Sequence, residues 1–242
     1  MNGLLVIDKP GGMTSRDVVN RVQRWFPKGW KVGHTGTLDP LATGVLVVCV
    51  GAATRLADLV QGMGKSYQSR FRLGARSDTD DADGTVTPVS VVTPPTAERV
   101  RAALESFVGH IEQVPPVYSA LKLGGKRAHD LARRGKEVSL APRMVRVDAV
   151  RLLGYDWPFV DVEIDCGKGT YIRSIARDLG ERLGCGGLVE TLRRTRVGSF
   201  TTEQGIGIDV TPEQGRAKLL PVEAVTRWSP KADGGLTPPA SL

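Results

Sequence analysis

An unbroken apolar run at residues 45–50 follows a twelve-residue string, residues 33–44, that contains three glycines. A continuous apolar run of this length predicts a strand buried on both faces of a sheet. Within the string, Pro40 biases Asp39 towards an extended conformation, and the glycines permit close backbone approaches. The pattern therefore predicts a fixed loop that presents Asp39 as a reactive group beside a buried strand. A hairpin turn in which the aspartate bonds its own backbone is the alternative.

Strands and helices intermix along the rest of the chain. Ser15 and Thr96 are suited to cap the helices that follow them, and valines recur on one face of the first of these helices. Because no regular strand–helix–strand rhythm is present, we predict an α+β fold with a mixed, mostly antiparallel sheet flanked by helices and loops. The expected strands cover residues 4–7, 45–50, 67–73, 145–153, 159–166 and 196–201, and the expected helices residues 15–25, 96–107, 126–134 and 170–183.

The charge of the chain favours a polyanionic partner. Its 242 residues include 33 Lys or Arg against 26 Asp or Glu, which gives a formal net charge of +7. The excess is concentrated in residues 121–151, which contain nine basic side chains and three acidic ones. An ordinary solvated surface is the alternative, but a segment that contacts nucleic-acid phosphates fits this density better.

The cofactor and metal motifs in the chain are incomplete. The three cysteines, Cys49, Cys166 and Cys185, are widely spaced, which argues against a disulfide framework and a zinc site. The triplet at residues 64–66, Gly-Lys-Ser, lacks the earlier glycine of a phosphate-binding loop. The aspartates at residues 78–83 lack the glycine register and the final glutamate of a calcium loop, so a solvated acidic turn is expected. We expect no cofactor and no metal.

The location of the protein is predicted from the first ten residues and from the length of the apolar runs. The first ten residues include an acid and a proline where a signal peptide needs an apolar stretch. The longest apolar run, residues 45–50, is too short to cross a bilayer. We therefore expect a cytoplasmic protein with no membrane association.

Six ordered motifs carry a family resemblance that spans most of the chain. They include the Asp39 string, and together they resemble the bacterial tRNA pseudouridine-55 synthases, the TruB family. The resemblance implies the pseudouridine synthase fold and the isomerisation of uridine 55 in the T loop of tRNA. The motifs are residues 5–15, 33–44, 65–67, 115–122, 169–174 and 192–195.

The resemblance also implies roles for particular side chains. Asp39 would be the catalytic carboxylate, Arg173 its charge partner, and Tyr67 the ring that stacks on the flipped uracil. His34 would meet the RNA next to Asp39, and Leu192 would form an apolar wall of the pocket. Two further residues within the matched motifs, Tyr171 and Lys9, are expected at the substrate, and the segment around Lys9 supports the active-site loop in the family.

Plainer interpretations of these residues remain open on the sequence alone. Arg173 could be a solvated arginine, the tyrosines could be core aromatics, and His34 could belong to a turn. The physical argument for Arg173 is that a carboxylate buried in a closed pocket must be paired to stay ionised.

The domain organisation follows from the resemblance and the chain length. We expect a catalytic domain over residues 1–205 with a basic RNA-binding insertion at about 115–142, and a short extension over residues 206–230. Residues 231–242 are expected to be disordered. No full PUA domain fits in what remains.

We expect a monomer that binds the T stem-loop of tRNA and requires no protein partner. A non-catalytic tRNA-binding or folding protein on the same scaffold is one alternative. A guide-RNA-dependent pseudouridylase is another, although that class normally uses the PUA domain.

Overall fold

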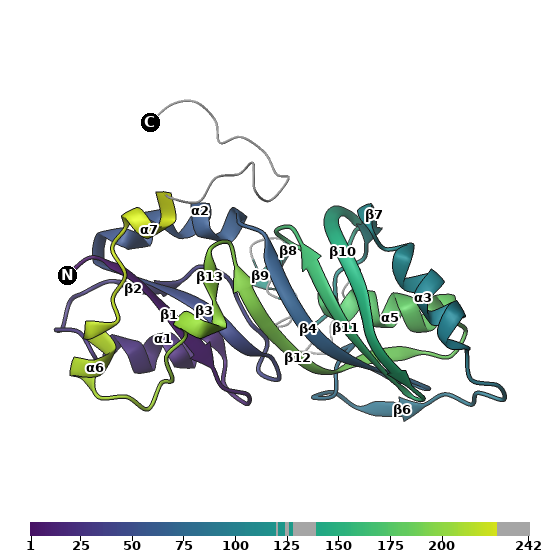
Figure 1. The fold of residues 1–242 in the computed structure, drawn as a ribbon. Helices are drawn as coiled ribbons and strands as arrows, with labels where there is room; N and C mark the ends of the chain where they lie inside the picture. Colours follow the sequence, from purple (N-terminus) through teal and green to yellow (C-terminus); the bar gives the residue numbers. More distant parts are fainter. Residues whose placement is uncertain (120, 124–125, 128–138, 227–242) are drawn as a thin grey trace. The chain divides into compact units, whose positions relative to one another are not determined.

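The structure is a computed structural model of the full chain, and it describes all residues except 120, 124–125, 128–138 and 227–242. The chain forms two compact units. Unit 1 contains Met1–Tyr67 and the chain from Arg193 onward, and unit 2 contains Gln68–Leu192. The chain crosses from one unit to the other within strands β4 (Lys65–Leu73) and β12 (Gly187–Val197) (Figure 1).

The sheet of unit 1 is built around β3. Strand β1 pairs with β3 along its whole length, from Gly3 opposite Val50 to Lys9 opposite Gly44, and β2 lies antiparallel on the same strand. The pairing of β3 with β12 is parallel, and β12 turns back antiparallel into β13. These strands are β1 (Gly3–Lys9), β2 (Val32–His34), β3 (Thr43–Val50) and β13 (Phe200–Thr201).

Strand β3 confirms the prediction from the apolar run. Every side chain from residue 45 to residue 50 is fully buried, as a strand covered on both faces requires. Burial also raises the pKa of the Cys49 thiol to about 12, because ionisation is costly in an apolar environment. Cys49 and Cys166 are core residues, as predicted, and Cys49 is unsuited to be a nucleophile.

Helix α1 (Ser15–Gln23) packs against β2 through its apolar face. Val18, Val19 and Val22 are buried, as their spacing predicts. The predicted cap was wrong by one residue. Thr14 is the N-cap, and it forms a reciprocal capping box with Asp17, whose carboxylate accepts from the Thr14 amide. This leaves the Ser15 hydroxyl to bond elsewhere in the unit.

The chain beyond β13 covers the outer edge of β1. The amide and carbonyl of Leu4 both bond to Leu220, and Ile206 bonds to the backbone of Val6 and of Asp8. An edge strand with its backbone groups paired in this way is protected from further pairing. The short helical elements of unit 1 are η1 (Gly51–Leu56), α2 (Ala57–Gly62), η2 (Thr202–Gln204), α6 (Pro212–Ala217) and α7 (Glu223–Thr226).

Unit 2 has its own sheet and two helices. Its strands follow the order β12, β4, β11 (Phe159–Cys166), β10 (Arg143–Asp156) and β7 (Gly109–Gln113). The β10–β11 hairpin is antiparallel, as predicted, and β10 is also antiparallel to β7. Two separate small pairs are β5 (Ala75–Ser77) with β6 (Val86–Pro88), and β8 (Lys122–Leu123) with β9 (Lys126–Arg127).

Helix α3 (Ala97–Glu105) packs against β10 and α5 (Ile172–Arg182). Thr96 caps α3, as predicted. The predicted basic helix at 126–134 was wrong at its first two residues, which form β9, and its remainder lies outside the described residues. The final strand was predicted too short at its start, since β12 begins at Gly187 and ends before a turn into β13.

These elements confirm an α+β fold with a mostly antiparallel arrangement of strands. The pairing of β3 with β12 is parallel. The antiparallel pairs include β1 with β3, β2 with β3, β12 with β13, β10 with β11, and β10 with β7. No helix in the described part of the chain is long and apolar enough to cross a membrane. The predicted domain boundaries at residues 205 and 230 stay predictions, and residues 231–242 lie outside the described range.

Candidate active site

The loop that carries Asp39 connects β2 to β3, and its backbone is fixed from helix α1. The Ser15 hydroxyl accepts a hydrogen bond from the Leu38 amide (2.8 Å) and donates one to the Leu38 carbonyl (3.1 Å). A single buried side chain thus satisfies both backbone groups of the residue before Asp39. The Asp39 carbonyl accepts from Ala42, which closes the turn.

The other side of the loop is held by Lys9 at the end of β1. Its ammonium donates to the carbonyls of Pro10 (2.8 Å), Met13 (2.7 Å) and Pro40 (3.2 Å), and the residue is fully buried. Lys9 therefore ties the turn after β1 to the residue that follows Asp39. Contact between Lys9 and a substrate stays a prediction.

A third group, Arg194 on β12, binds the two flanks of the loop. Its guanidinium donates to the carbonyls of Gly36 (3.2 Å), Thr37 (3.4 Å) and Val45 (2.7 Å). The parallel pairing of β3 with β12 brings the backbones close here, and a side chain at Gly44 would lie 2.2 Å from the Arg194 carbonyl oxygen. Gly44 also has a φ of +97°, so this position needs glycine for two reasons.

Two more predicted site residues lie in unit 1 with Asp39. His34 is the last residue of β2, opposite Val48, and Tyr67 is a buried residue of β4. The structure therefore places Asp39, His34, Lys9 and Tyr67 in unit 1. Stacking of Tyr67 on a base and contact of His34 with RNA stay predictions.

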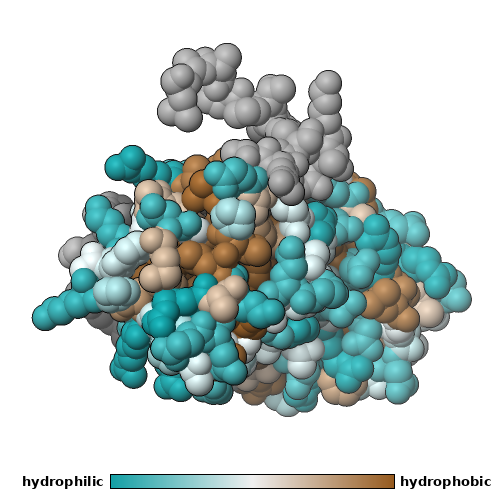
Figure 2. Space-filling model, turned by 60° about the vertical axis from the view of Figure 1, so that its left-hand side comes forward, coloured by the Kyte–Doolittle hydropathy of each residue, from teal (hydrophilic) through white to brown (hydrophobic). Residues whose placement is uncertain are grey.

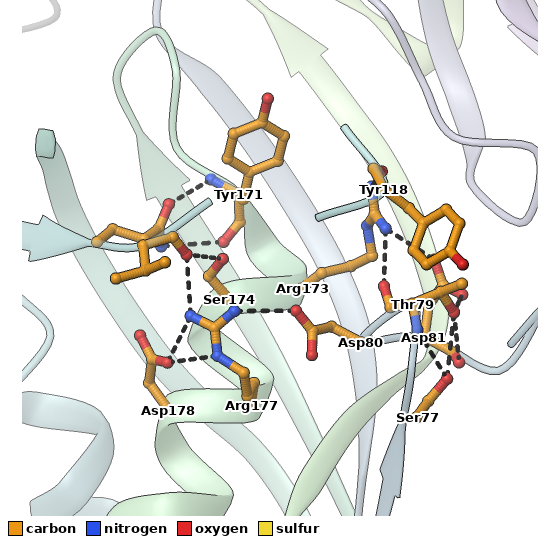
Figure 3. Close-up of polar contacts among 12 residues, drawn as sticks. Ser77, Thr79, Asp80, Asp81, Tyr118, Tyr171, Arg173, Ser174, Arg177 and Asp178 are labelled. Carbon is orange, nitrogen blue, oxygen red and sulfur yellow. Dashed lines mark hydrogen bonds and ion pairs between the residues drawn. The ribbon is translucent and has the colours of Figure 1, made fainter. Parts of the chain in front are cut away.

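Arg173, Tyr171 and Leu192 belong to unit 2, and both terminal nitrogens of Arg173 have partners within it. Its guanidinium donates to the carbonyls of Thr79 (2.7 Å) and Tyr118 (2.9 Å) and lies 3.4 Å from the Asp81 carboxylate (Figure 3). Only 3% of the residue is exposed. The interpretation of Arg173 as a solvated arginine is therefore wrong, and its pairing with Asp39 stays a prediction.

The acidic segment at residues 78–83 is only partly a solvated turn. Asp78 and Asp83 are exposed, but Asp81 is buried, and its carboxylate accepts from the Thr79 hydroxyl (2.6 Å) and the Asp83 amide (3.2 Å). The expectation of a solvated acidic turn was therefore wrong for Asp81. The buried carboxylate neutralises the buried charge of Arg173.

Tyr171 is the N-cap of α5, one residue later than the predicted helix start at residue 170. Its backbone is fixed by Gln113. The Gln113 side-chain amide donates to the Tyr171 carbonyl (3.1 Å) and accepts from the Tyr171 amide (2.8 Å). The Arg143 guanidinium lies 4.9 Å from the centre of the Tyr171 ring, a cation–π contact. Leu192 is a buried residue of β12. Substrate contacts of both Tyr171 and Leu192 stay predictions.

Sequence reasoning missed four residues that build these surroundings. Ser15 and Arg194 lie inside the quoted motifs, but a serine suited to a cap and an arginine in a basic triplet gave no sign of burial. Asp81 was treated as one aspartate among several, and Gln113 precedes a motif by two residues. No local signal marks Arg194, whose neighbours in the sequence are Arg193 and Thr195.

Comparisons with known proteins identify the family of this chain. A family model described as the TruB family pseudouridylate synthase N-terminal domain matches residues 23–172, and one described as the tRNA pseudouridylate synthase B C-terminal domain matches residues 173–210. The chain belongs to the TruB family of pseudouridylate synthases.

Two relatives and one solved structure show the extent of the similarity. A Cereibacter sphaeroides protein named tRNA pseudouridine synthase B is 49% identical over 221 residues, which cover 91% of this chain and 73% of the relative. The protein of that name from Mycobacterium sp. (strain KMS) is 45% identical over 240 residues, which cover 98% and 80%. A chain in the crystal structure of a Cbf5-Nop10-Gar1 complex is 27% identical with a TM-score of 0.70, and the match covers 92% of this chain and 61% of that one.

Proposed function

We propose that this protein isomerises uridine to pseudouridine at position 55 in the T loop of tRNA. Family membership supports the reaction, and the names of the relatives support tRNA as the substrate. The observation that carries the assignment of a catalytic residue is the loop of Asp39. Lys9, Ser15 and Arg194 bind its backbone, so the position of a carboxylate-bearing residue is fixed before any substrate arrives.

The reaction breaks the bond between uracil N1 and ribose C1′, turns the ring, and forms a bond from C5 to C1′. The hydrogen on C5 leaves as a proton and N1 gains one, so no oxidant, reductant or cofactor is required. Asp39 serves by attacking the sugar carbon, by stabilising positive charge there, or by accepting a proton from the sugar. Arg173 is the charge partner of this carboxylate, and Tyr67 stacks on the uracil after it leaves the helical stack.

The basic character of the described surface supports an RNA partner. Lys28, Lys31 and Arg55 line a hollow of about 590 Å³ at the end of β3 away from the Asp39 loop, together with Trp30. The described lining of this hollow contains no acidic residue. Cations without acidic neighbours attract phosphates, and an adjacent aromatic ring suits a base or a ribose. Figure 2 shows hydrophilic residues over much of the visible face, with apolar residues in a central patch and in smaller areas at the right and along the lower edge.

The remaining parts of the proposal concern how the protein works in the cell. It acts as a monomer in the cytoplasm, binds the T stem-loop, and needs no protein partner. The basic segment, to which the β8–β9 pair belongs, would contact phosphates of the T arm. His34 and Tyr171 would contact the nucleotides beside the flipped base, and Leu192 would line its pocket.

The experiment uses unmodified tRNA transcripts with tritium at C5 of uridine. The purified protein alone should release tritium from the wild-type transcript and from a 17-nucleotide T-arm hairpin, and release should stop when uridine 55 is replaced by cytidine. Release that is unaffected by the replacement would contradict the position. Binding without release from any transcript would favour a non-catalytic RNA-folding protein or a missing guide RNA.

A further inference from the structure

Helix α5 carries a second arginine that reaches the same two segments as Arg173. Arg177 lies one turn later, so both side chains project from one side of the helix. Its guanidinium donates to the Asp80 carboxylate (2.9 Å; Figure 3) and to the Val114 carbonyl (2.9 Å). The segment that contains Asp80 also supplies Thr79 and Asp81 to Arg173, and the segment that begins at Val114 supplies Tyr118.

The turn between these contacts has an unusual backbone. Asp80 has a φ of +60°, a left-handed conformation that residues other than glycine rarely adopt. This conformation sends the side chains of two consecutive aspartates to two different arginines, Asp80 to Arg177 and Asp81 to Arg173. The pairing of Asp80 with Arg177 therefore holds the turn in the conformation that places Asp81 beside Arg173.

We infer that Arg177 is a positioning residue for the reaction and acts through Asp80 and Val114 on the orientation of Arg173. The inference rests on the proposed function, in which Arg173 takes part at the reacting carboxylate. Without the guanidinium of Arg177, the Asp80 carboxylate loses its partner in a largely buried place, where only 16% of its side chain is exposed. The turn then relaxes from its left-handed conformation, and Asp81 moves with it.

The surroundings of Arg177 provide a matched control. Asp178 also accepts from its guanidinium (2.9 Å), but Asp178 lies on α5 itself, and its carboxylate forms no hydrogen bond or ion pair with the described residues of either segment. Burial raises the pKa of both carboxyl groups, and the charge of Arg177 opposes that rise. Arg177 therefore affects the pKa of Asp80 and the pKa of Asp178 in the same direction. Of these two aspartates, only Asp80 belongs to the turn.

The test compares Arg177→Met, Asp80→Asn and Asp178→Asn with the wild type in single-turnover pseudouridine formation on the full tRNA. Arg177→Met and Asp80→Asn should lower the rate constant at saturating enzyme by about 10-fold to 100-fold, because small misplacements of catalytic groups have effects of this size. Their tRNA affinity should stay within about 2-fold of wild type, and Asp178→Asn should keep the wild-type rate. Asparagine tolerates the left-handed conformation, so Asp80→Asn remains foldable.

A structural readout accompanies the kinetics. In protein labelled with ¹⁵N-arginine, the Nε resonance of Arg173 should shift in Arg177→Met and in Asp80→Asn and stay in place in Asp178→Asn. The inference is wrong if Arg177→Met turns over at the wild-type rate, or if all three variants slow in proportion to their melting temperatures. Failure of the proposed function is distinguishable, since the wild type itself would then form no pseudouridine.

Discussion

Two buried arginines, one in each unit, show two ways of fixing a functional segment. Arg194 of unit 1 donates to three backbone carbonyls that flank the Asp39 loop. Arg173 of unit 2 donates to two carbonyls and also lies beside the buried carboxylate of Asp81. Both residues are at most 3% exposed, so they do not differ in burial. They differ in the groups that accept their hydrogen bonds.

The acceptors of Arg194 are uncharged, whereas the partners of Arg173 include a carboxylate. Carbonyl acceptors do not titrate, so the geometry of the Asp39 loop should be insensitive to pH. The surroundings of Arg173 contain ionised carboxylates, and removal of one partner there leaves a charge in a buried place. Unit 2 should therefore respond more strongly to charge-changing substitutions than unit 1.

The largest effect is expected at Arg173. Arg173→Met should lower the free energy of unfolding by about 3–5 kcal/mol, because it leaves the Asp81 carboxylate buried without its guanidinium. Urea denaturation measures the change. The double variant Asp81→Asn with Arg173→Met should recover part of the loss, since no buried charge then remains. Strict additivity of the two substitutions would show that the ion pair is not the source of the effect.

A smaller effect is expected at Arg194. Arg194→Met should lower the free energy of unfolding by about 1–3 kcal/mol, because three carbonyls lose a donor but no charge is stranded. Arg193→Met is the matched control on the same strand. Arg193 forms a half-exposed bidentate pair with Asp8 (2.9 and 3.0 Å), and its loss should cost less than about 1 kcal/mol. Equal losses for the two variants would contradict the burial-based account.

Ser15→Ala tests how the Asp39 loop is fixed by an uncharged side chain. The Leu38 amide and carbonyl both lose their partner, so the free energy of unfolding should fall by about 1–2 kcal/mol. The loss should be the same at pH 5 and pH 8, because neither partner titrates. The rate of pseudouridine formation should fall as well, since the loop is less fixed. A loss that varies with pH would show that an ionising group takes part in the contact between Ser15 and Leu38.

The smallest effect concerns the pH dependence of unit 2. Burial raises the pKa of Asp178, against the opposing charges of Arg177 and Arg182, so the folded state holds this proton to a higher pH than the unfolded chain. The stability that Asp178 contributes is complete below about pH 4 and is lost as the pH rises through its folded pKa. Wild type should therefore lose stability relative to Asp178→Asn across that range. A relative gain would mean that pairing with Arg177 outweighs burial.

The sheet was largely predictable from the sequence, because its buried strands carry unmistakable patterns. The structure contains the strands that were predicted at residues 45–50, 145–153 and 159–166. The error at Ser15 arose because Thr14 and Ser15 are both capable caps, and only the position of Asp17 decides between them. The tertiary contact of Ser15 with Leu38 is not visible in local sequence.

The sequence predicted the residues of the candidate site but not the residues that hold them in place. Family motifs identified Asp39 and Arg173, but the burial of Arg194 depends on a parallel strand pairing between residues about 150 apart in sequence. The role of Asp81 likewise depends on a helix that begins about 90 residues later. Long-range partners of this kind leave no periodic signal, since propensity and spacing describe only neighbours.

The most direct test of the account is the single-turnover rate of pseudouridine formation in an unmodified tRNA transcript, measured for wild type and Asp39→Asn beside the tRNA affinity of each. The account predicts a rate loss of more than about 10³-fold with affinity unchanged within about 3-fold, because the carboxylate acts in the reaction and its loop is held by other residues. Turnover by Asp39→Asn at a rate near that of wild type would contradict it.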